Sequence, residues 1–143
     1  MKVSAKAEYA CVAMVELAIK YPAELPVQIK TIAQMHGISP RFLVQILLQL
    51  KGAGLVASSR GSGGGYQLTR PPEEMHLAEI VRAIDHSPRA PSALTALPKT
   101  LVVQSLRAVW DEVSEAEEEI LGRTSLAILV QRSQERDAAM YQI

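Results

Sequence analysis

The sequence predicts a mainly α-helical protein with one small β-hairpin. Apolar residues recur at helical spacing over most of the 143 residues, and a glycine followed by a Ser-Pro pair interrupts this pattern near residue 38. A glycine-rich run also stands between two short strand-like segments. Three helices and a hairpin in this order make a winged helix-turn-helix domain, which is followed by a long helix suited to dimerisation.

The first helix is expected between Ser4, a good N-cap, and Pro22, which ends the apolar periodicity. A second helix over 28–36 stops at Gly37, the residue type that favours a helix C-terminus. The short connection "HGIS" then leads directly into a third helix, so the pair forms a helix-turn-helix.

The third helix is expected to begin with Ser39 as its cap and Pro40 at its first position, where the missing N–H costs nothing. The segment "GAG" at 52–54 ends it. Its predicted inner face consists of Leu43, Ile46, Leu47 and Leu50.

The stretch "SSRGSGGGYQLTR", residues 58–70, has three candidate explanations: a phosphate-binding loop, a flexible linker or the tip of a hairpin. A phosphate loop should open a helix and carry a following lysine, but "YQLTRPP" follows here. A linker fits poorly because apolar patterning continues on both sides. A hairpin with Leu55, Ala57, Tyr66 and Leu68 alternating on its inner face explains the glycines, because a tight tip needs positive-φ positions.

The second half begins with Pro71-Pro72 and a helix over "LAEIVRAID". An irregular loop reaches Thr100, and a helix from Leu101 to Leu121 follows, with a short helix in "SLAILVQR" and a tail behind it. The long helix carries more apolar residues than one small domain can cover, so a partner helix is expected. Its predicted dimerisation residues are Leu106, Val109, Trp110, Val113 and Ile120.

These elements divide the chain into four parts. Residues 1–86 form the predicted DNA-binding winged helix-turn-helix domain, and 87–100 form the irregular loop. Residues 101–122 form the dimerisation helix, and 123–143 form the C-terminal short helix and tail.

The net charge of zero hides an uneven distribution. Residues 1–72 hold eight Lys or Arg against three Glu, a formal charge of +5, and no acidic residue stands between Glu24 and Glu73. A surface that faces phosphates has this charge pattern, so double-stranded DNA is the expected partner, although chance clustering of solvated charges would look the same. No apolar run reaches the roughly 20 residues of a membrane span, so we expect no membrane partner and a cytoplasmic location.

Arg41 and Gln45 are four residues apart on the outer face of the third helix, where arginine could read guanine and glutamine adenine. Arg60 at the hairpin tip is suited to a narrow minor groove. For each of these residues the alternative is a solvated surface position. The full set of candidate DNA-binding residues is Gln28, Ser39, Pro40, Arg41, Gln45, Lys51, Arg60, Gly61, Ser62, Gly63, Gly64 and Tyr66.

The sequence offers no catalytic constellation, no metal site and no cofactor motif. Cys11 is the single cysteine, which excludes an internal disulfide and a multi-cysteine cluster site within one chain. It is the one candidate for a redox-active residue, but its place on an apolar helix stripe favours a structural role. His36 and His86 are too isolated for a metal site.

The segment "IKTIAQMHGISPRFLVQILLQLKGAGLVASSRGSGGGYQLTR" resembles the Rrf2 family of winged-helix transcriptional repressors, above all in "GLVxSxRGxGGGYxL". The resemblance extends over nearly the whole chain. It implies a homodimer crossed through the long helix, a pseudo-palindromic operator and a signal received near the loop before that helix.

Two departures limit what the resemblance implies. Cluster-binding members carry three cysteines in the loop, whereas "HSPRAPSALTALPK" has none, so no iron–sulfur cluster is expected. Val44 replaces an acidic residue with which several relatives discriminate operators. The sequence leaves four alternatives for the effector: a small molecule bound between the first helix and the long helix, a thiol oxidant, a partner enzyme, or no effector. A dimeric adaptor that has lost DNA binding is the alternative function.

Overall fold

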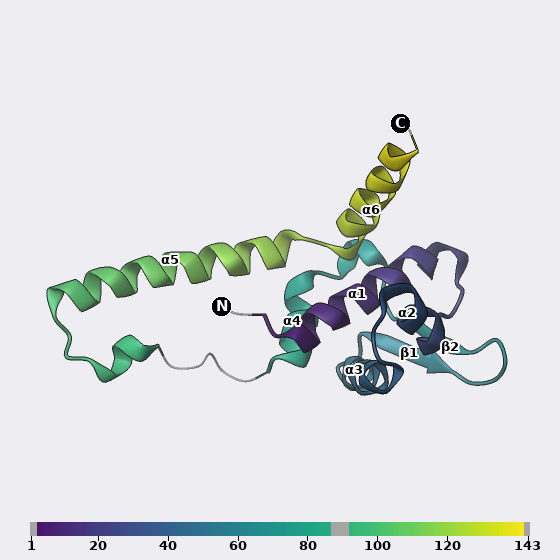
Figure 1. Ribbon diagram of the computed structural model, residues 1–143, viewed down its shortest axis with the longest axis horizontal. Helices are drawn as coiled ribbons and strands as arrows, with labels where there is room; N and C mark the ends of the chain where they lie inside the picture. Colours follow the sequence, from purple (N-terminus) through teal and green to yellow (C-terminus); the bar gives the residue numbers. More distant parts are fainter. Residues whose placement is uncertain (1–2, 87–91, 142–143) are drawn as a thin grey trace.

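The computed structural model describes residues 3–86 and 92–141 (Figure 1). Its order of helices and its single described hairpin confirm the predicted fold class. The elements are α1 (Ala5–Lys20), α2 (Ile29–His36), α3 (Pro40–Gly52), β1 (Val56–Ser59), β2 (Gly65–Leu68), α4 (Leu77–Ile84), α5 (Leu101–Arg123) and α6 (Leu126–Met140). Short 3-10 turns occupy Tyr21–Ala23, Pro72–Glu74 and Ala93–Ala96. None of the described helices is long and apolar enough to cross a membrane.

Helix α1 lies at the centre of the winged domain and packs against α3, α4, α6 and β2. The Ser4 hydroxyl accepts a hydrogen bond from the Ala7 N–H at 3.0 Å, as predicted for an N-cap. Ala7, Ala10 and Ala13 are completely buried, and these small side chains let the neighbouring elements approach closely.

The turn between α2 and α3 follows the prediction in its backbone but not in its cap. Gly37 adopts φ 65°, the left-handed conformation that ends a helix, and Pro40 opens α3. Ser39 occupies the N-cap position, yet its hydroxyl makes no capping hydrogen bond. The cap prediction for Ser39 is therefore wrong at the side chain, although the Ser39 carbonyl accepts the first helical hydrogen bond, from the Leu43 N–H at 3.0 Å.

Strands β1 and β2 pair in antiparallel register, with Val56 opposite Leu68 and Ser59 opposite Gly65. The inner face differs from the prediction, because Val56 is buried and Ala57 is exposed. Leu55 is also buried, but it belongs to the turn after α3, where its N–H donates to the Leu50 carbonyl. Only the first residue of β1 is therefore buried, and the expected alternation is absent from this strand.

The end of α4 is tied to the start of α1. Asp85 accepts the Ser4 backbone N–H at 3.0 Å and the Ser4 hydroxyl at 2.6 Å. The irregular loop begins just beyond this contact. Its residues 87–91 lie outside the described part of the chain, and the described remainder contains the 3-10 turn Ala93–Ala96.

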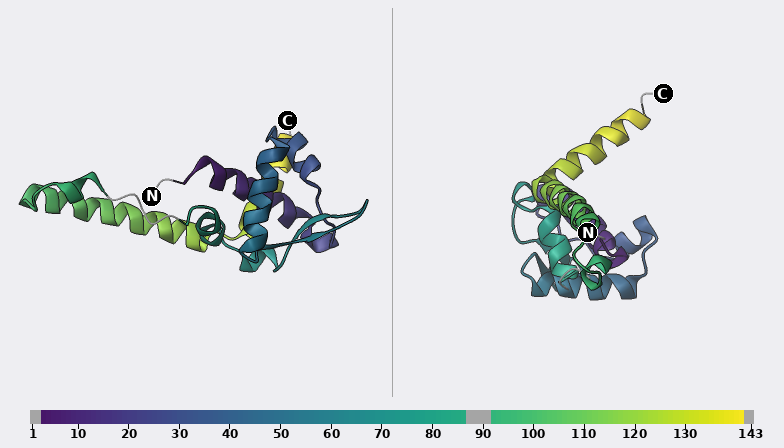
Figure 2. Two further views of the ribbon diagram at one scale, coloured as in Figure 1. Left: turned by 90° about the horizontal axis from the view of Figure 1, so that it is seen from below. Right: turned by 90° about the vertical axis from the view of Figure 1, so that its left-hand side faces the viewer.

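Helix α5 extends away from the winged domain, whereas α6 begins against α1 and then projects outward (Figures 1 and 2). The junction is fixed by backbone hydrogen bonds from Leu77 N–H to the Thr124 carbonyl and from Leu126 N–H to the Met75 carbonyl. Leu126 is fully buried in the same core as α1. Helix α6 continues to Met140, so most of the predicted C-terminal tail is helical.

Candidate nucleic-acid interface

The outer face of α3 carries the predicted polar residues. Arg41 and Gln45 are both exposed, while Leu43, Ile46, Leu47 and Leu50 hold the opposite face in the core. Successive residues of an α-helix are about 100° apart, so Arg41, Val44, Gln45 and Leu48 share one arc of the helix. Val44 and Leu48 are exposed as well, at 40% and 55%.

From the sequence, Val44 stood out only as the replacement of an acidic residue found in several relatives, and Leu48 was given no functional role. The signal that could have found them is their spacing of three and seven residues from Arg41, which places them beside the predicted base-reading side chains.

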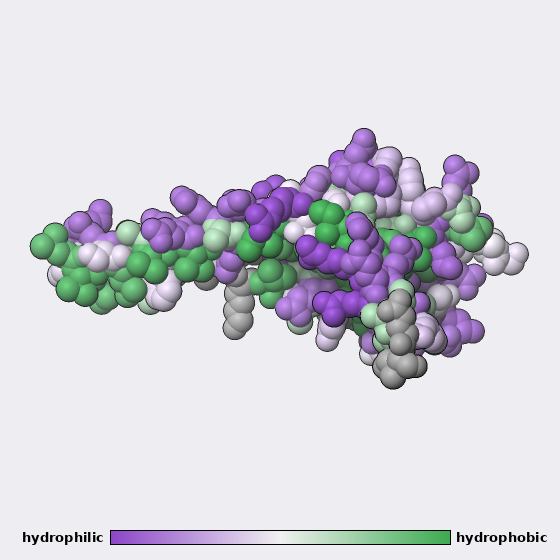
Figure 3. All heavy atoms as spheres, turned by 90° about the horizontal axis from the view of Figure 1, so that it is seen from above, coloured by the Kyte–Doolittle hydropathy of each residue, from purple (hydrophilic) through white to green (hydrophobic). Residues whose placement is uncertain are grey.

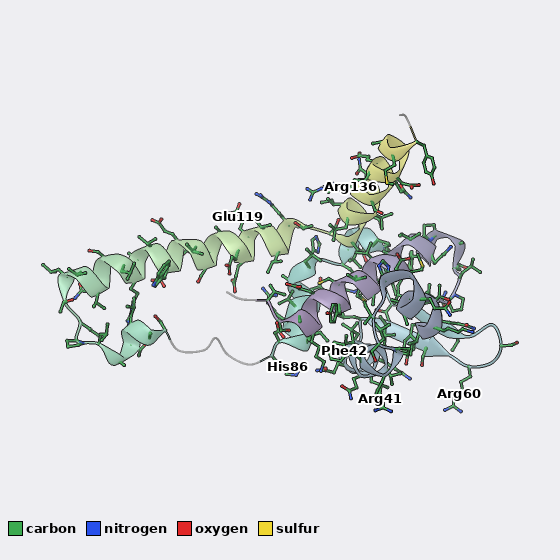
Figure 4. The ribbon with its side chains drawn as sticks, in the orientation of Figure 1. Arg41, Phe42, Arg60, His86, Glu119 and Arg136 are labelled. Atoms are coloured by element: carbon green, nitrogen blue, oxygen red, sulfur yellow. The ribbon has the colours of Figure 1, made fainter. Side chains whose placement is uncertain are left out.

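The hairpin tip projects Arg60 toward the same side of the molecule as Arg41 (Figure 4). Arg60, Gly61, Ser62 and Gly63 are all exposed. The tip is a tight turn in which the Gly64 N–H donates to the Gly61 carbonyl at 3.0 Å and Gly61 adopts φ 99°. The glycines thus form a compact turn that presents Arg60 to solvent.

Gly64 has a different role, because it is buried beneath the tip. A Cβ atom at this position would lie 2.4 Å from the Ser59 carbonyl oxygen and 2.8 Å from the Arg60 carbonyl carbon. Only a residue without a side chain allows the two arms of the hairpin to come this close. Gly63, by contrast, has open space around it.

The wing is joined to the beginning of α2. Val27 and Tyr66 exchange two backbone hydrogen bonds of 2.9 Å, and the Gln28 side-chain amide donates to the Ser62 carbonyl at 3.4 Å. Gly65 fits closely here, since a Cβ atom would lie 2.5 Å from the Val27 carbonyl oxygen. The structure therefore gives Gln28 and half-buried Tyr66 roles in holding the wing against the helix-turn-helix.

Lys51 is also engaged within the chain. Its ammonium group donates to the Ser58 hydroxyl at 2.7 Å and links the last turn of α3 to β1. The predicted interface thus contains two groups of residues. Ser39, Pro40, Arg41 and Gln45 lie at or near the exposed start of α3, and Arg60 to Gly63 lie at the wing tip.

Cys11 lies away from both groups, on α1. Burial raises the pKa of its thiol to about 11, and the carboxylates of Glu8 and Asp85 act in the same direction. Cys11 lines a hollow of about 350 Å³ between α1 and α6, with His36 also on its wall. On the same wall, a carboxylate oxygen of Glu16 lies 2.9 Å from Nε2 of the His36 imidazole. A neutral, half-buried thiol is a poor nucleophile.

The predicted dimerisation residues share one side of α5. Leu106, Val109, Trp110, Val113 and Ile120 are all 40% exposed or more, and no residue of α5 is buried. Figure 3 shows the apolar side chains of α5 gathered along one edge of the helix and hydrophilic ones along the other.

The comparisons with known proteins agree with this arrangement. The family described as "Rrf2: Iron-dependent Transcriptional regulator" matches residues 3–132. The chain belongs to the Rrf2 family. The transcriptional regulator CymR of Bacillus subtilis is 33% identical over 144 residues, covering 100% of both chains. The regulator IscR of Xenorhabdus nematophila is 33% identical and covers 97% of this chain and 85% of its own.

Among solved structures, that of CymR of B. subtilis, titled "the Global Cysteine Regulator", has a TM-score of 0.80 at 33% identity. The superposition covers 92% of this Rrf2 chain and 98% of CymR. The structure of T. potens IscR has a TM-score of 0.76 at 34% identity and covers 95% and 90% of the two chains. These relatives are winged-helix transcriptional regulators, which confirms both the predicted family and the predicted fold.

The iron in the family description does not fit the donor residues of this Rrf2 protein as an iron–sulfur cluster. Such clusters are held mainly by several cysteine thiolates, and the chain has one cysteine, which is held as a neutral thiol in α1. Within residues 3–86 and 92–141, no group of three or more His, Cys, Asp or Glu residues is arranged to hold a metal ion.

Proposed function

We propose that this protein is a DNA-binding transcriptional repressor that acts as a cytoplasmic homodimer on a pseudo-palindromic operator without an iron–sulfur cluster. The observation that carries the proposal is the shared orientation of Arg41 and Arg60 (Figure 4). They come from a helix and a wing tip inside a stretch with no acidic residue from 25 to 72. A helix in the major groove with a cationic tip in the minor groove is a known mode of DNA binding.

Each part of the interface has a proposed role. Arg41 and Gln45 read base edges, and Ser39 with Pro40 brings the start of α3 to the phosphates. Arg60 enters the minor groove, while the backbone N–H groups of Gly61, Ser62 and Gly63 approach the sugar-phosphate backbone. Gln28, Lys51, Gly64 and Tyr66 act mainly by holding the wing in place.

The proposed homodimer rests on α5. Its apolar residues Val102, Leu106, Val109, Val113, Ala116 and Ile120 alternate at spacings of four and three, which is the seam of a two-helix coiled coil. An exposed seam of this kind, with half of Trp110 also in solvent, supports pairing with a second α5. We accordingly divide the chain into a DNA-binding part, 1–86, a loop at 87–100, a dimerisation helix, 101–122, and a C-terminal part, 123–143.

The hollow beside Cys11 is a candidate place for a small molecule, and it borders α1, α2 and α6 rather than the long helix. A dimeric adaptor that no longer binds DNA is the second candidate, because it is equally compatible with the exposed α5 seam.

Titration of a library of genomic DNA fragments with the purified full chain, at low and at moderate salt, tests the proposal. We expect retention of fragments at low salt and a steep fall in affinity with salt, because counterions leave the phosphates that Lys and Arg neutralise. Absence of any retained fragment at low salt would favour the adaptor.

A further inference from the structure

The recognition face of α3 combines two polar side chains with two branched aliphatic ones. Val44 and Leu48 are 40% and 55% exposed, and they lie in the same arc as Arg41 and Gln45. Single exposed aliphatic residues are common on protein surfaces and need no explanation. Here, however, both lie beside the residues that face the proposed partner, and the surrounding formal charges are positive.

The C5-methyl of thymine is the one methyl group on the base edges of the major groove, where the remaining recognition atoms are hydrogen-bond donors and acceptors. Valine and leucine side chains can form no hydrogen bond. Against a guanine, adenine or cytosine edge they would displace water without replacing its hydrogen bonds. Against a thymine methyl they would bury apolar surface on both partners.

We propose that Val44 and Leu48 recognise the 5-methyl groups of thymines in the major groove of the operator. The inference rests on the proposed DNA-binding function and names part of its sequence specificity. Val44 and Leu48 are four residues apart, which is about 6 Å along the helix axis, and two base-pair steps span about 7 Å along the DNA axis. The two thymines are therefore expected within about two base-pair steps of each other, beside the bases that Arg41 and Gln45 read.

The test uses a high-affinity duplex selected from random DNA by the parent chain. Each thymine is replaced singly by deoxyuridine, which removes the methyl group and keeps every hydrogen-bonding atom. Burial of one methyl-sized group corresponds to about a fourfold change in affinity, so each contacted position should weaken binding by about that factor. The remaining thymines should tolerate the replacement.

Val44→Ala and Leu48→Ala identify the side chain responsible. In each variant the deoxyuridine penalty should disappear at one position per half-site and persist at the other. Met140→Ala removes a similarly exposed apolar side chain from the end of α6, so it should retain both penalties. Thermal unfolding of each variant checks that the fold is intact.

Three results decide the inference. Equal binding of thymine and deoxyuridine at every position would overturn it while leaving the proposed function intact. Penalties that persist unchanged in both alanine variants would also overturn it, because the methyl would then act through DNA shape. A parent chain that binds no duplex at low salt would overturn the proposed function itself.

Discussion

At the scale of single residues, removal of the Arg60 side chain tests whether the hairpin tip contacts DNA or is only a turn. It is exposed at the hairpin tip, where a guanidinium is attracted by a narrow minor groove. Arg60→Ala should weaken specific binding by about 1 to 3 kcal/mol, chiefly at sites with A·T-rich sequence at the wing position. Fluorescence anisotropy with matched A·T-rich and G·C-rich duplexes measures this.

Arg136→Ala is the matched control for Arg60→Ala, because it removes the same charge from exposed α6. It should leave affinity close to that of the parent. Equal affinity of Arg60→Ala and the parent for both duplexes would mean that the glycine-rich tip is only a turn.

The thiol of Cys11 provides a second prediction at this scale. Its pKa of about 11 leaves about one molecule in a thousand as thiolate at pH 8, since burial disfavours the charged form. Alkylation by iodoacetamide should therefore be slow in the native protein and accelerate as pH rises toward 11. In denaturant the same residue should react at the ordinary rate of an exposed cysteine. Rapid native alkylation at neutral pH would restore the redox role.

At the scale of elements, the wing depends on one buried glycine. Gly64→Ala places a Cβ within 2.4 Å of the Ser59 carbonyl oxygen, so the two arms of the hairpin must separate. We expect a loss of about 1 to 3 kcal/mol in the free energy of unfolding, measured with urea, and a larger relative loss of DNA affinity. Gly63→Ala adds the same atom in open space and should unfold at the same urea concentration as the parent. Equal behaviour of the two variants would contradict this role for Gly64.

The elements also show how far sequence reasoning reaches. Gly37 and Pro40 fixed the boundaries of the helix-turn-helix because their backbone preferences are local. The side-chain cap at Ser39 was mispredicted, and so was the burial of Val56 in place of Ala57. Both depend on how the turns before α3 and before β1 pack against the core.

The full length of the C-terminal helix, which was expected to be short, and part of the candidate site were missed for tertiary reasons. Helix α6 is anchored by Leu126, whose position is set by backbone hydrogen bonding to Met75 far away in the sequence. The polar candidates Arg41 and Arg60 were predictable from charge and motif. The exposure of Val44 and Leu48 on the same face was not, because an apolar residue is expected inside until its exposure is known.

At the scale of the whole molecule, α5 leaves an apolar seam uncovered by its own chain. Val113→Glu places a carboxylate in the middle of this seam, and in a symmetric pair two such charges would meet. The variant should lose about 3 kcal/mol or more of association free energy and sediment as a monomer. Ala108→Glu adds the same charge on the opposite side of α5 and should remain dimeric. A parent that sediments as a monomer would refute the proposed pairing.

A homodimer that places two copies of α3 and of the wing on one duplex must read a symmetric site. Selection of binding sites from random duplex DNA by the purified full chain is the most direct measurement of this claim. We predict enrichment of an inverted repeat whose half-sites lie about one helical turn, or a multiple of it, apart. Pools that show no enriched sequence, or a single half-site without its symmetric partner, would contradict the account.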